Sequence, residues 1–316
     1  MNRPIGILYE HPEWFKPLFQ ELERQSVPFE PIDAGHHTFE PGSAAERYSV
    51  VVNRMSPSAG LRGHGRAIFH SLSYLTHLEE VGANVINGRR AFEFEISKVR
   101  QLDLLARLGV RFPRTKAVNH RSQIVDAAGD LRYPVLLKPN IGGSGGGIRS
   151  FADPGELARA VSVGESFDMG LDNTILVQEH LPARDESIVR IEILDGEFLY
   201  AIRIRLVPGS FNLCPADYCD LPGVVDGVSG RGLPIESYTP PKAIIDQARQ
   251  IVAAAGMDLG GVEYLIDDRD GEPYFYDLNA LSNFVADADQ VIGFDPFVDL
   301  ARFIGHRAER ATVAVG

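Results

Sequence analysis

The sequence predicts a mixed α/β protein with two or three subdomains. Near the N-terminus, short apolar runs typical of buried strands alternate with segments whose apolar residues recur at helical spacing. Further along, two pairs of strand-like runs are joined by turns that end in Asp-Gly, which predicts two β-hairpins. A chain of 316 residues with 44% hydrophobic content can bury a core large enough for such a division.

The first part of the chain predicts a parallel sheet that extends to about Gly88. Strands are expected at residues 4–9, 49–53 and 83–86, and apolar spacing predicts helices over 14–22 and 68–78. In open parallel sheets, ligands bind beyond the carboxyl ends of the strands. Arg54 follows the second strand, so it is a candidate to bind a substrate carboxylate through a bidentate pair, or else a surface arginine.

A helix is predicted over about 94–108, with an apolar face, Lys98 near its start and Gly109 at its end. The next buried strand, 133–139 (YPVLLKP), carries Lys138. Burying an unpaired ammonium group is costly, so we expect Lys138 either to face an anion or to extend to the surface at the strand end.

Residues 140–148 (NIGGSGGGI) hold five glycines in six positions. Glycine permits positive backbone φ angles and exposes consecutive N–H groups, so such a loop can bind phosphate oxygens. The loop is neither a Walker A motif nor a dinucleotide-binding GxGxxG motif. A glycine-rich hairpin turn is the alternative.

Residues 174–181 (TILVQEHL) predict a strand with a polar end, and 188–194 with 197–206 predict a hairpin that turns at Asp195-Gly196. Arg203 and Arg205 alternate with isoleucines, so both arginines lie on one face, where they can bind phosphate or be solvated. Between 207 and 241 the composition predicts a long loop that covers a site. Helices are expected at 156–163, 243–256 and 296–304.

The segment 260–284 (GGVEYLIDDRDGEPYFYDLNALSNF) predicts a second hairpin with oxygen-bearing side chains on both strands. Asp277 and Asn279 are two residues apart in an extended segment, so they share a face, and Glu263 on the partner strand can meet them. Three such ligands suit Mg²⁺, which keeps its other positions for water and phosphates. A solvated acidic hairpin is the alternative reading.

Charge and composition exclude several other classes of protein. A formal net charge of −12 argues against a nucleic-acid partner. No apolar run approaches the roughly 20 residues of a membrane span and no signal peptide is visible, so we expect no membrane partner and a cytoplasmic location. The only cysteines, Cys214 and Cys219, are too few for a disulfide scaffold, and their CPADYC segment is either a metal ligand pair or an ordinary loop.

Four blocks occur in a characteristic order: VINGRRAFEFEISKVRQLDLLARLGVRFPRT, YPVLLKPNIGGSGGGI, ILVQEHLP and YFYDLNALSNF. Together they resemble the ATP-grasp superfamily, in the branch of carboxylate-amine ligases that includes glutathione synthetase, D-alanine-D-alanine ligase and enzymes that add glutamate to protein termini. The resemblance runs from about residue 53 to 304. It implies an N-terminal parallel-sheet substrate domain (1–93), a small ATP-binding lobe with a glycine flap (94–178) and a large ATP-binding lobe with the magnesium site (179–316).

The resemblance also implies roles for individual residues. Lys98 and Lys138 are expected at the ATP phosphates, and Glu186 at the ribose hydroxyls. The flap over the phosphates comprises Gly143, Ser144, Gly145 and Gly146, and the hinge that receives adenine comprises Gln178, Glu179, His180 and Leu181. The magnesium ligands are Glu263, Asp277 and Asn279, and the arginine near the transferred phosphoryl group is Arg205, with Arg203 and Arg190 as the other candidates. Substrates are expected near Asn53, Arg54, Asn212, Ser282 and Asn283.

Two positions depart from that family. Asp277 stands where glutamate is usual, and Ser210 stands where the glutamate-adding enzymes have arginine, although Asn212 is retained. The substrate of those enzymes is therefore not assumed for this chain.

The expected activity is an ATP-dependent, ADP-forming ligation of a carboxylate to an amine through an acylphosphate, on an amino acid or small peptide. The cofactors are ATP and one or two Mg²⁺ ions, with Mn²⁺ as a substitute, and a homodimer is common in the family. The alternatives are a non-catalytic ATP-binding module of the same fold and an ATP-grasp phosphoryl transferase or carboxylase. Both lysines and all three metal ligands are present, which favours an enzyme.

Overall fold

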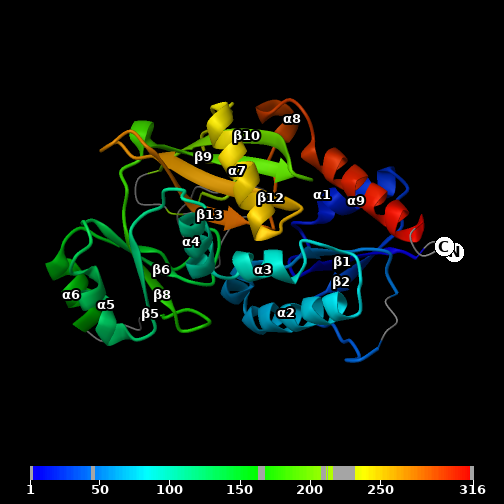
Figure 1. The fold of residues 1–316 in the computed structure, drawn as a ribbon, viewed down its shortest axis with the longest axis horizontal. Coiled ribbons are helices and arrows are strands. Elements are labelled where there is room, and N and C mark those ends of the chain that lie inside the picture. The colour runs from blue at the N-terminus through cyan, green and yellow to red at the C-terminus, as the bar shows by residue number, and fades with distance from the viewer. Residues whose placement is uncertain are drawn as a thin grey trace.

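Three sheets, each in its own lobe, make up the computed structural model of the chain (Figure 1). The structure describes residues 3–43, 47–162, 168–207, 211, 213–215 and 232–313. The strand orders are β2-β1-β3-β4, β5-β8-β6-β7 and β11-β10-β9-β12-β13. The mixed α/β class predicted from the sequence is confirmed. No helix within the described ranges is long and apolar enough to cross a membrane.

The N-terminal lobe contains the parallel sheet that the sequence predicts. One of its strands, which contains Pro31, was not predicted. It lies at the edge of the sheet, where proline is tolerated. The elements are β1 (Ile5–Tyr9), α1 (Lys16–Arg24), β2 (Phe29–Asp33), β3 (Val51–Arg54), η1 (Pro57–Arg62), α2 (Gly65–Glu80) and β4 (Val85–Ile86).

The small lobe is an antiparallel sheet with two short helices against it, at the lower left of Figure 1. The elements are β5 (Thr115–Val118), η2 (Arg121–Gln123), α5 (Ile124–Ala128), β6 (Val135–Pro139), β7 (Arg149–Phe151), α6 (Pro154–Ser162) and β8 (Ile175–Glu179).

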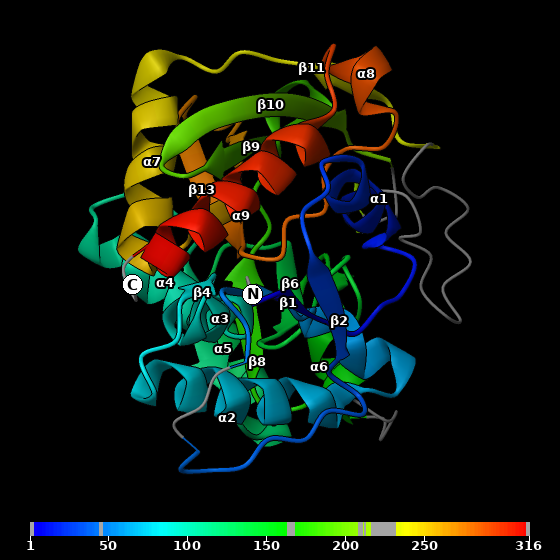
Figure 2. The same cartoon turned by 90° about the vertical axis from the view of Figure 1, so that its right-hand side faces the viewer.

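The large lobe contains both predicted hairpins, joined by pairing of β12 with β9. Helix α7 covers one face of this sheet, and α1 with α9 packs near the other, as the turned view in Figure 2 shows. The elements are η3 (Arg184–Glu186), β9 (Ser187–Leu194), β10 (Glu197–Arg205), β11 (Ile235–Ser237), α7 (Lys242–Ala255), β12 (Leu259–Ile266), β13 (Pro273–Asn279), α8 (Ala288–Val291) and α9 (Pro296–Val313).

The helix expected over 94–108 is two helices, α3 (Arg89–Glu95) and α4 (Lys98–Arg107). The break follows from Ser97, whose Oγ accepts a hydrogen bond from the backbone N–H of Arg100 and so begins α4 as an N-cap. Although the expected domain bounds place α4 in the small lobe, it packs against β13 and α7 of the large lobe.

Alternation along β9 assigns its side chains to two different faces. Val189, Ile191 and Ile193 point into the core beneath α7. Arg190 and Glu192 point to the opposite face, although both are buried. Two charged side chains on the covered face of a central strand need nearby partners, and these partners lie in the functional site.

Candidate active site

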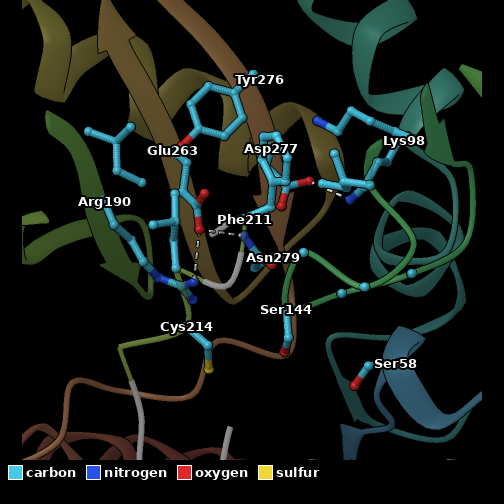
Figure 3. Close-up of a pocket in the computed structure, with 18 of the residues that line it drawn as sticks. Ser58, Lys98, Ser144, Arg190, Phe211, Cys214, Glu263, Tyr276, Asp277 and Asn279 are labelled. Atoms are coloured by element: carbon cyan, nitrogen blue, oxygen red, sulfur yellow. Dashed lines mark hydrogen bonds and ion pairs between the residues drawn. The ribbon is translucent and has the colours of Figure 1, made fainter. Parts of the chain in front are cut away.

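A cavity of about 350 Å³ lies where the three lobes meet, and Figure 3 shows part of its lining. Its wall combines the end of β3, the glycine loop (142–147), the end of β8 and the β12–β13 hairpin. We call it the central cavity. Most of the residues predicted for ATP and metal binding line it: Lys98, Lys138, Gly143, Ser144, Gly145, Gly146, Gln178, Glu179, His180, Leu181, Glu263, Asp277 and Asn279.

The β12–β13 register brings the predicted metal ligands together. Glu263 pairs directly with Asp277, and Gly261 pairs with Asn279. The Asn279 Nδ2 lies 3.5 Å from the Glu263 Oε1. A bulge after this pair leaves Tyr276 outside the register, and Tyr276 also lines the cavity beside Glu263.

Each of the two carboxylates bonds to a cation. The Lys98 Nζ donates to the Asp277 Oδ1 at 2.7 Å, and the Arg190 Nη1 donates to the Glu263 Oε1 at 3.1 Å (Figure 3). Burial alone would lower the pKa of Lys98, but the attraction of Asp277 outweighs it and raises that pKa. Each of these two carboxylates therefore has a cationic partner when no metal ion is bound.

Lys138 is buried, with 6% of its surface exposed, and no carboxylate of the described residues bonds to it. Its Nζ donates to the Gln178 Oε1 at 3.3 Å and lies 5.6 Å from the centre of the Tyr276 ring. Burial, reinforced by the charge of Lys98, lowers the pKa of Lys138 to about 8. An ammonium group held without a counter-ion at a cavity wall is a binding point for an anion.

The glycine loop adopts the backbone angles that its composition predicts. Ser144, Gly145 and Gly147 have φ values of 55°, 71° and 75°. The loop lies against the N-terminal lobe, since a Cβ added to Gly146 would come within 2.6 Å of the Leu61 side chain. Leu171 makes a similar contact with the N-terminal lobe, where a Cβ on Gly60 would lie 2.8 Å from its Cδ1. The small lobe is therefore closed onto the N-terminal lobe.

The hinge predicted for adenine lies on the cavity wall, but some of its polar groups already form hydrogen bonds with other residues of the protein. The backbone N–H of His180 donates to the carbonyl of Pro134, and the Glu179 carboxylate accepts from the N–H of Arg132. Glu186, predicted for the ribose hydroxyls, is exposed and does not line the central cavity. Its backbone has a φ of 47°, next to Asp185 at 56°.

Of the three candidate arginines, only Arg190 lines the central cavity. Arg203 donates to Glu236 on β11 and stacks 4.0 Å from the centre of the Tyr238 ring, and Arg205 is exposed. The β9–β10 register explains the difference. Arg203 pairs with Val189, which points away from the cavity, whereas Arg190 pairs with Ile202. The structure thus favours Arg190 over Arg205.

The predicted substrate residues Asn53 and Arg54 do not line the cavity. Asn53 donates to the carbonyl of Asn87 and accepts from the N–H of Met55. Arg54 is 1% exposed, and its Nη2 donates to the carbonyl of Ser282 at 2.7 Å, while its Nε and Nη1 lack a partner among the described residues. Burial lowers the pKa of Arg54 to about 10, which leaves it charged. Arg54 therefore joins two lobes and is closed off from a substrate in the cavity.

The remaining predicted substrate residues have different positions. Ser282 and Asn283 line the cavity, but the Ser282 hydroxyl bonds to Arg190 and Glu192. Asn212 and Cys219 lie outside the described residues, whereas Phe211 and Cys214 beside them line the cavity. Phe211, Leu213 and Cys214 of the range predicted as a loop, 207–241, therefore contribute to the cavity wall, whereas β11 lies within the same range, which is thus not all loop.

The sequence reasoning missed several residues of the site. Trp14, Ser56 and Ser58 form the wall that the N-terminal lobe contributes to the cavity. They follow β1 and β3, at the strand ends where ligands are expected, so that rule applied to every strand would have found them. Glu192 was also missed, although a charged residue two positions from Arg190 in an apolar strand is the same signal that identified Lys138.

Glu95 is a further buried carboxylate, at the end of α3, and it also lines the central cavity. It accepts hydrogen bonds from the backbone N–H groups of Ala280 and Leu281. Burial raises the pKa of Glu95 from 4.5 to about 7. Between these two pH values the folded protein keeps a proton that the unfolded chain has lost, so rising pH lowers the free energy of unfolding.

Replacing Glu95 with glutamine is expected to remove this pH dependence, because glutamine accepts the same two hydrogen bonds and never ionises. Relative to wild type, the variant should gain about 3 kcal/mol in unfolding free energy between pH 4.5 and pH 8. Urea unfolding at both pH values measures this, with Glu23→Gln on the exposed side of α1 as a control that leaves the difference unchanged. Parallel pH profiles for Glu95→Gln and wild type would contradict the assignment.

The donor set suits a hard cation. No group of three or more His, Cys, Asp or Glu side chains suited to a metal occurs in the part of the chain that the structure describes. The set here is instead two carboxylates and one amide, and oxygen donors of this kind with room for phosphate oxygens are what Mg²⁺ requires. The residues present therefore fit Mg²⁺ bound together with a nucleotide.

Comparison with known proteins agrees with this geometry. No family model matches the chain. The D-cycloserine synthetase DcsG superposes with a TM-score of 0.68 at 17% identity, covering 96% of this chain and 99% of that one. The D-alanine–D-alanine ligase of Bacillus anthracis gives 0.67 at 16% identity, covering 99% of each chain. The ATP-grasp ligase PsnB, in a complex with a precursor variant, Mg and ADP, gives 0.67 at 18% identity, covering 98% of this chain and all of that one. The chain therefore has the ATP-grasp fold, as its sequence predicts.

Curated relatives by sequence carry ligase names. A probable alpha-L-glutamate ligase of Pseudoalteromonas atlantica is 26% identical over 171 residues, 54% of this chain and 53% of the relative. A probable alpha-L-glutamate ligase of Teredinibacter turnerae is 31% identical over 144 residues, 45% of this chain and 46% of the relative. The chain spans about half the length of the curated relatives it matches. These names agree with the ligase branch to which the sequence blocks point.

Proposed function

We propose that this protein is an ATP-dependent, ADP-forming carboxylate-amine ligase. The observation that carries the proposal is the charge arrangement of the central cavity. No carboxylate of the described residues bonds to Lys138, the glycine loop lines the same cavity, and Glu263 and Asp277 there already bond to cations. This arrangement suits a polyphosphate that arrives with its metal ion, because the phosphates satisfy Lys138 and the ion replaces the bound cations.

In this proposal the protein positions and neutralises charge and supplies no nucleophile. Lys98, Lys138 and the glycine loop hold the phosphates, and Arg190 faces the transferred phosphoryl group. Glu263, Asp277 and Asn279 hold Mg²⁺, which when bound would neutralise developing charge on the phosphate oxygens. Closure of the glycine loop on Leu61 excludes water from an acylphosphate.

The acid and the amine are proposed to be amino acids or short peptides. The acid binds at the wall formed by Trp14, Ser56 and Ser58, which replaces Arg54 as the expected contact. The amine is proposed to approach past Ser282 and Asn283, which also line the central cavity. Glutamate is the first amino acid to test, both as the acid and as the amine, because the sequence relatives are named for it.

Release of ADP with mixtures of amino acids and dipeptides tests the proposal. ADP formation that requires both an acid and an amine is the expected result, and hydroxylamine in place of the amine is expected to yield an acylhydroxamate. Tight ATP binding with no amine-dependent turnover would indicate a nucleotide-binding module. Phosphorylated or carboxylated products without an amide would indicate a transferase or carboxylase.

A further inference from the structure

Arg190 is held by three partners in the interior of the large lobe. Its Nε donates to the Glu192 Oε1 at 2.6 Å, its Nη1 to the Glu263 Oε1 at 3.1 Å, and its Nη2 to the Ser282 Oγ at 3.0 Å. All four side chains are buried, so this one cation is shared between two carboxylates. Although burial lowers the pKa of Arg190, the attraction of Glu192 and Glu263 raises it, and the group stays charged.

The two carboxylates differ in their access to the central cavity. Glu263 lines the cavity and is a proposed metal ligand. Glu192 has no exposed surface and does not line the cavity. A metal ion in the cavity can therefore reach Glu263 but not Glu192, so Glu192 stays paired with Arg190 whether or not a metal ion is bound.

This difference matters because a buried cation needs a counter-ion. If Glu263 were the only partner of Arg190, a metal ion at Glu263 would leave the guanidinium unpaired, and arginine and metal would compete for one carboxylate. With Glu192 present, Glu263 can release Arg190 at little cost. We propose that Glu192 is a positioning residue that neutralises Arg190 permanently and so keeps Glu263 available to the metal ion, an inference that rests on the proposed function.

Ser282 fixes the geometry of this cluster. Its Oγ donates to the Glu192 Oε2 and accepts from the Arg190 Nη2, and its carbonyl accepts from Arg54 of the N-terminal lobe. After Glu263 binds metal, Arg190 is still held at Nε and Nη2. Its Nη1 is then the free donor, and it points into the cavity where the phosphoryl group is proposed to lie.

The test measures metal binding rather than activity. Titration calorimetry with Mn²⁺, in the presence of saturating ADP, gives the metal affinity of the protein. Replacing Glu192 with glutamine is expected to weaken Mn²⁺ binding by roughly tenfold or more, the usual effect of removing a group that supports a metal ligand. The matched control is Glu236→Gln, which breaks the Arg203 pair on the same sheet outside the cavity and is expected to change nothing.

A double-mutant cycle separates this role from a general electrostatic effect. In an Arg190→Met background there is no cation to compete for Glu263, so adding Glu192→Gln is expected to leave the Mn²⁺ affinity almost unchanged. An equal loss in both backgrounds would overturn the proposal, because it would show that Glu192 acts only through its charge on the metal. An unchanged affinity in Glu192→Gln alone would overturn it too.

Mn²⁺ binding by the wild-type protein separates failure of the proposed metal site from failure of the role proposed for Glu192. Absence of Mn²⁺ binding with ADP would refute the proposed metal site itself. If Glu192→Gln does not fold, a crystal structure of the wild type with Mg²⁺ and ADP decides the question. The Arg190 Nε is expected to stay within hydrogen-bond distance of Glu192 while Nη1 leaves Glu263; an Arg190 that leaves Glu192 would overturn the proposal.

Discussion

Replacing Lys138 with methionine is expected to abolish ATP-dependent turnover and, at the same time, to stabilise the protein. Turnover is lost because the phosphates lose their buried cation. Stability rises because the variant removes an ammonium group whose pKa burial lowers from 10.5 to about 8, a cost of about 1 to 3 kcal/mol at pH 7 after the lost ring contact is deducted. ADP release and urea unfolding measure the two effects.

Lys116→Met is the matched control for this prediction. Lys116 lies on β5 of the same lobe with 41% of its side chain exposed, and it pairs with Asp130 at the surface. Its replacement is expected to change neither turnover nor nucleotide binding. A Lys138→Met protein that is less stable than wild type would show that the lysine has a structural partner, and the anion-binding assignment would then fail.

Replacing Asn279 with alanine is expected to abolish turnover with the fold intact. The side chain is a proposed metal ligand. Its one hydrogen bond to the described residues is the 3.5 Å contact with Glu263, so its loss should cost less than about 1 kcal/mol of unfolding free energy. Circular dichroism and urea unfolding check the fold, and ADP release checks the activity.

The control for Asn279 is Asn119→Ala, an exposed asparagine in the small lobe. It is expected to behave as wild type in every assay. Near-normal turnover of Asn279→Ala would remove this residue from the metal site and leave Glu263 and Asp277 as the ligands to test next.

The parts of the site that could be predicted are those encoded by local pattern. Lys138 could be found because it interrupts an apolar run, and Glu263 with Asp277 because alternation on a hairpin determines which residues share a face. The choice between Arg190 and Arg203 could not be made in this way. Alternation shows that Arg203 and Arg205 share a face, but only the strand register shows that this face is opposite to the cavity.

Contacts between residues far apart in the chain could not be predicted from the sequence either. The contact between Arg54 and Ser282 joins residues 228 positions apart, and no spacing rule connects them. The substrate role was expected for Arg54 because of its position at a strand end. That position is confirmed, since β3 ends at Arg54. Its side chain turns into the protein interior instead, where the carbonyl of Ser282 and the ring of Phe15 receive it.

Arg54 also limits how this protein can be re-engineered. One way to change the acid that such a ligase accepts would be to replace its N-terminal lobe with that of another ATP-grasp protein. Here the N-terminal lobe contributes a fully buried side chain to the loop that holds Ser282, and through Ser282 to Arg190. A chimaera whose donor lobe lacks an arginine at the end of its third strand is therefore expected to disturb the site proposed for phosphoryl transfer, even if the proposed acid-binding wall forms correctly.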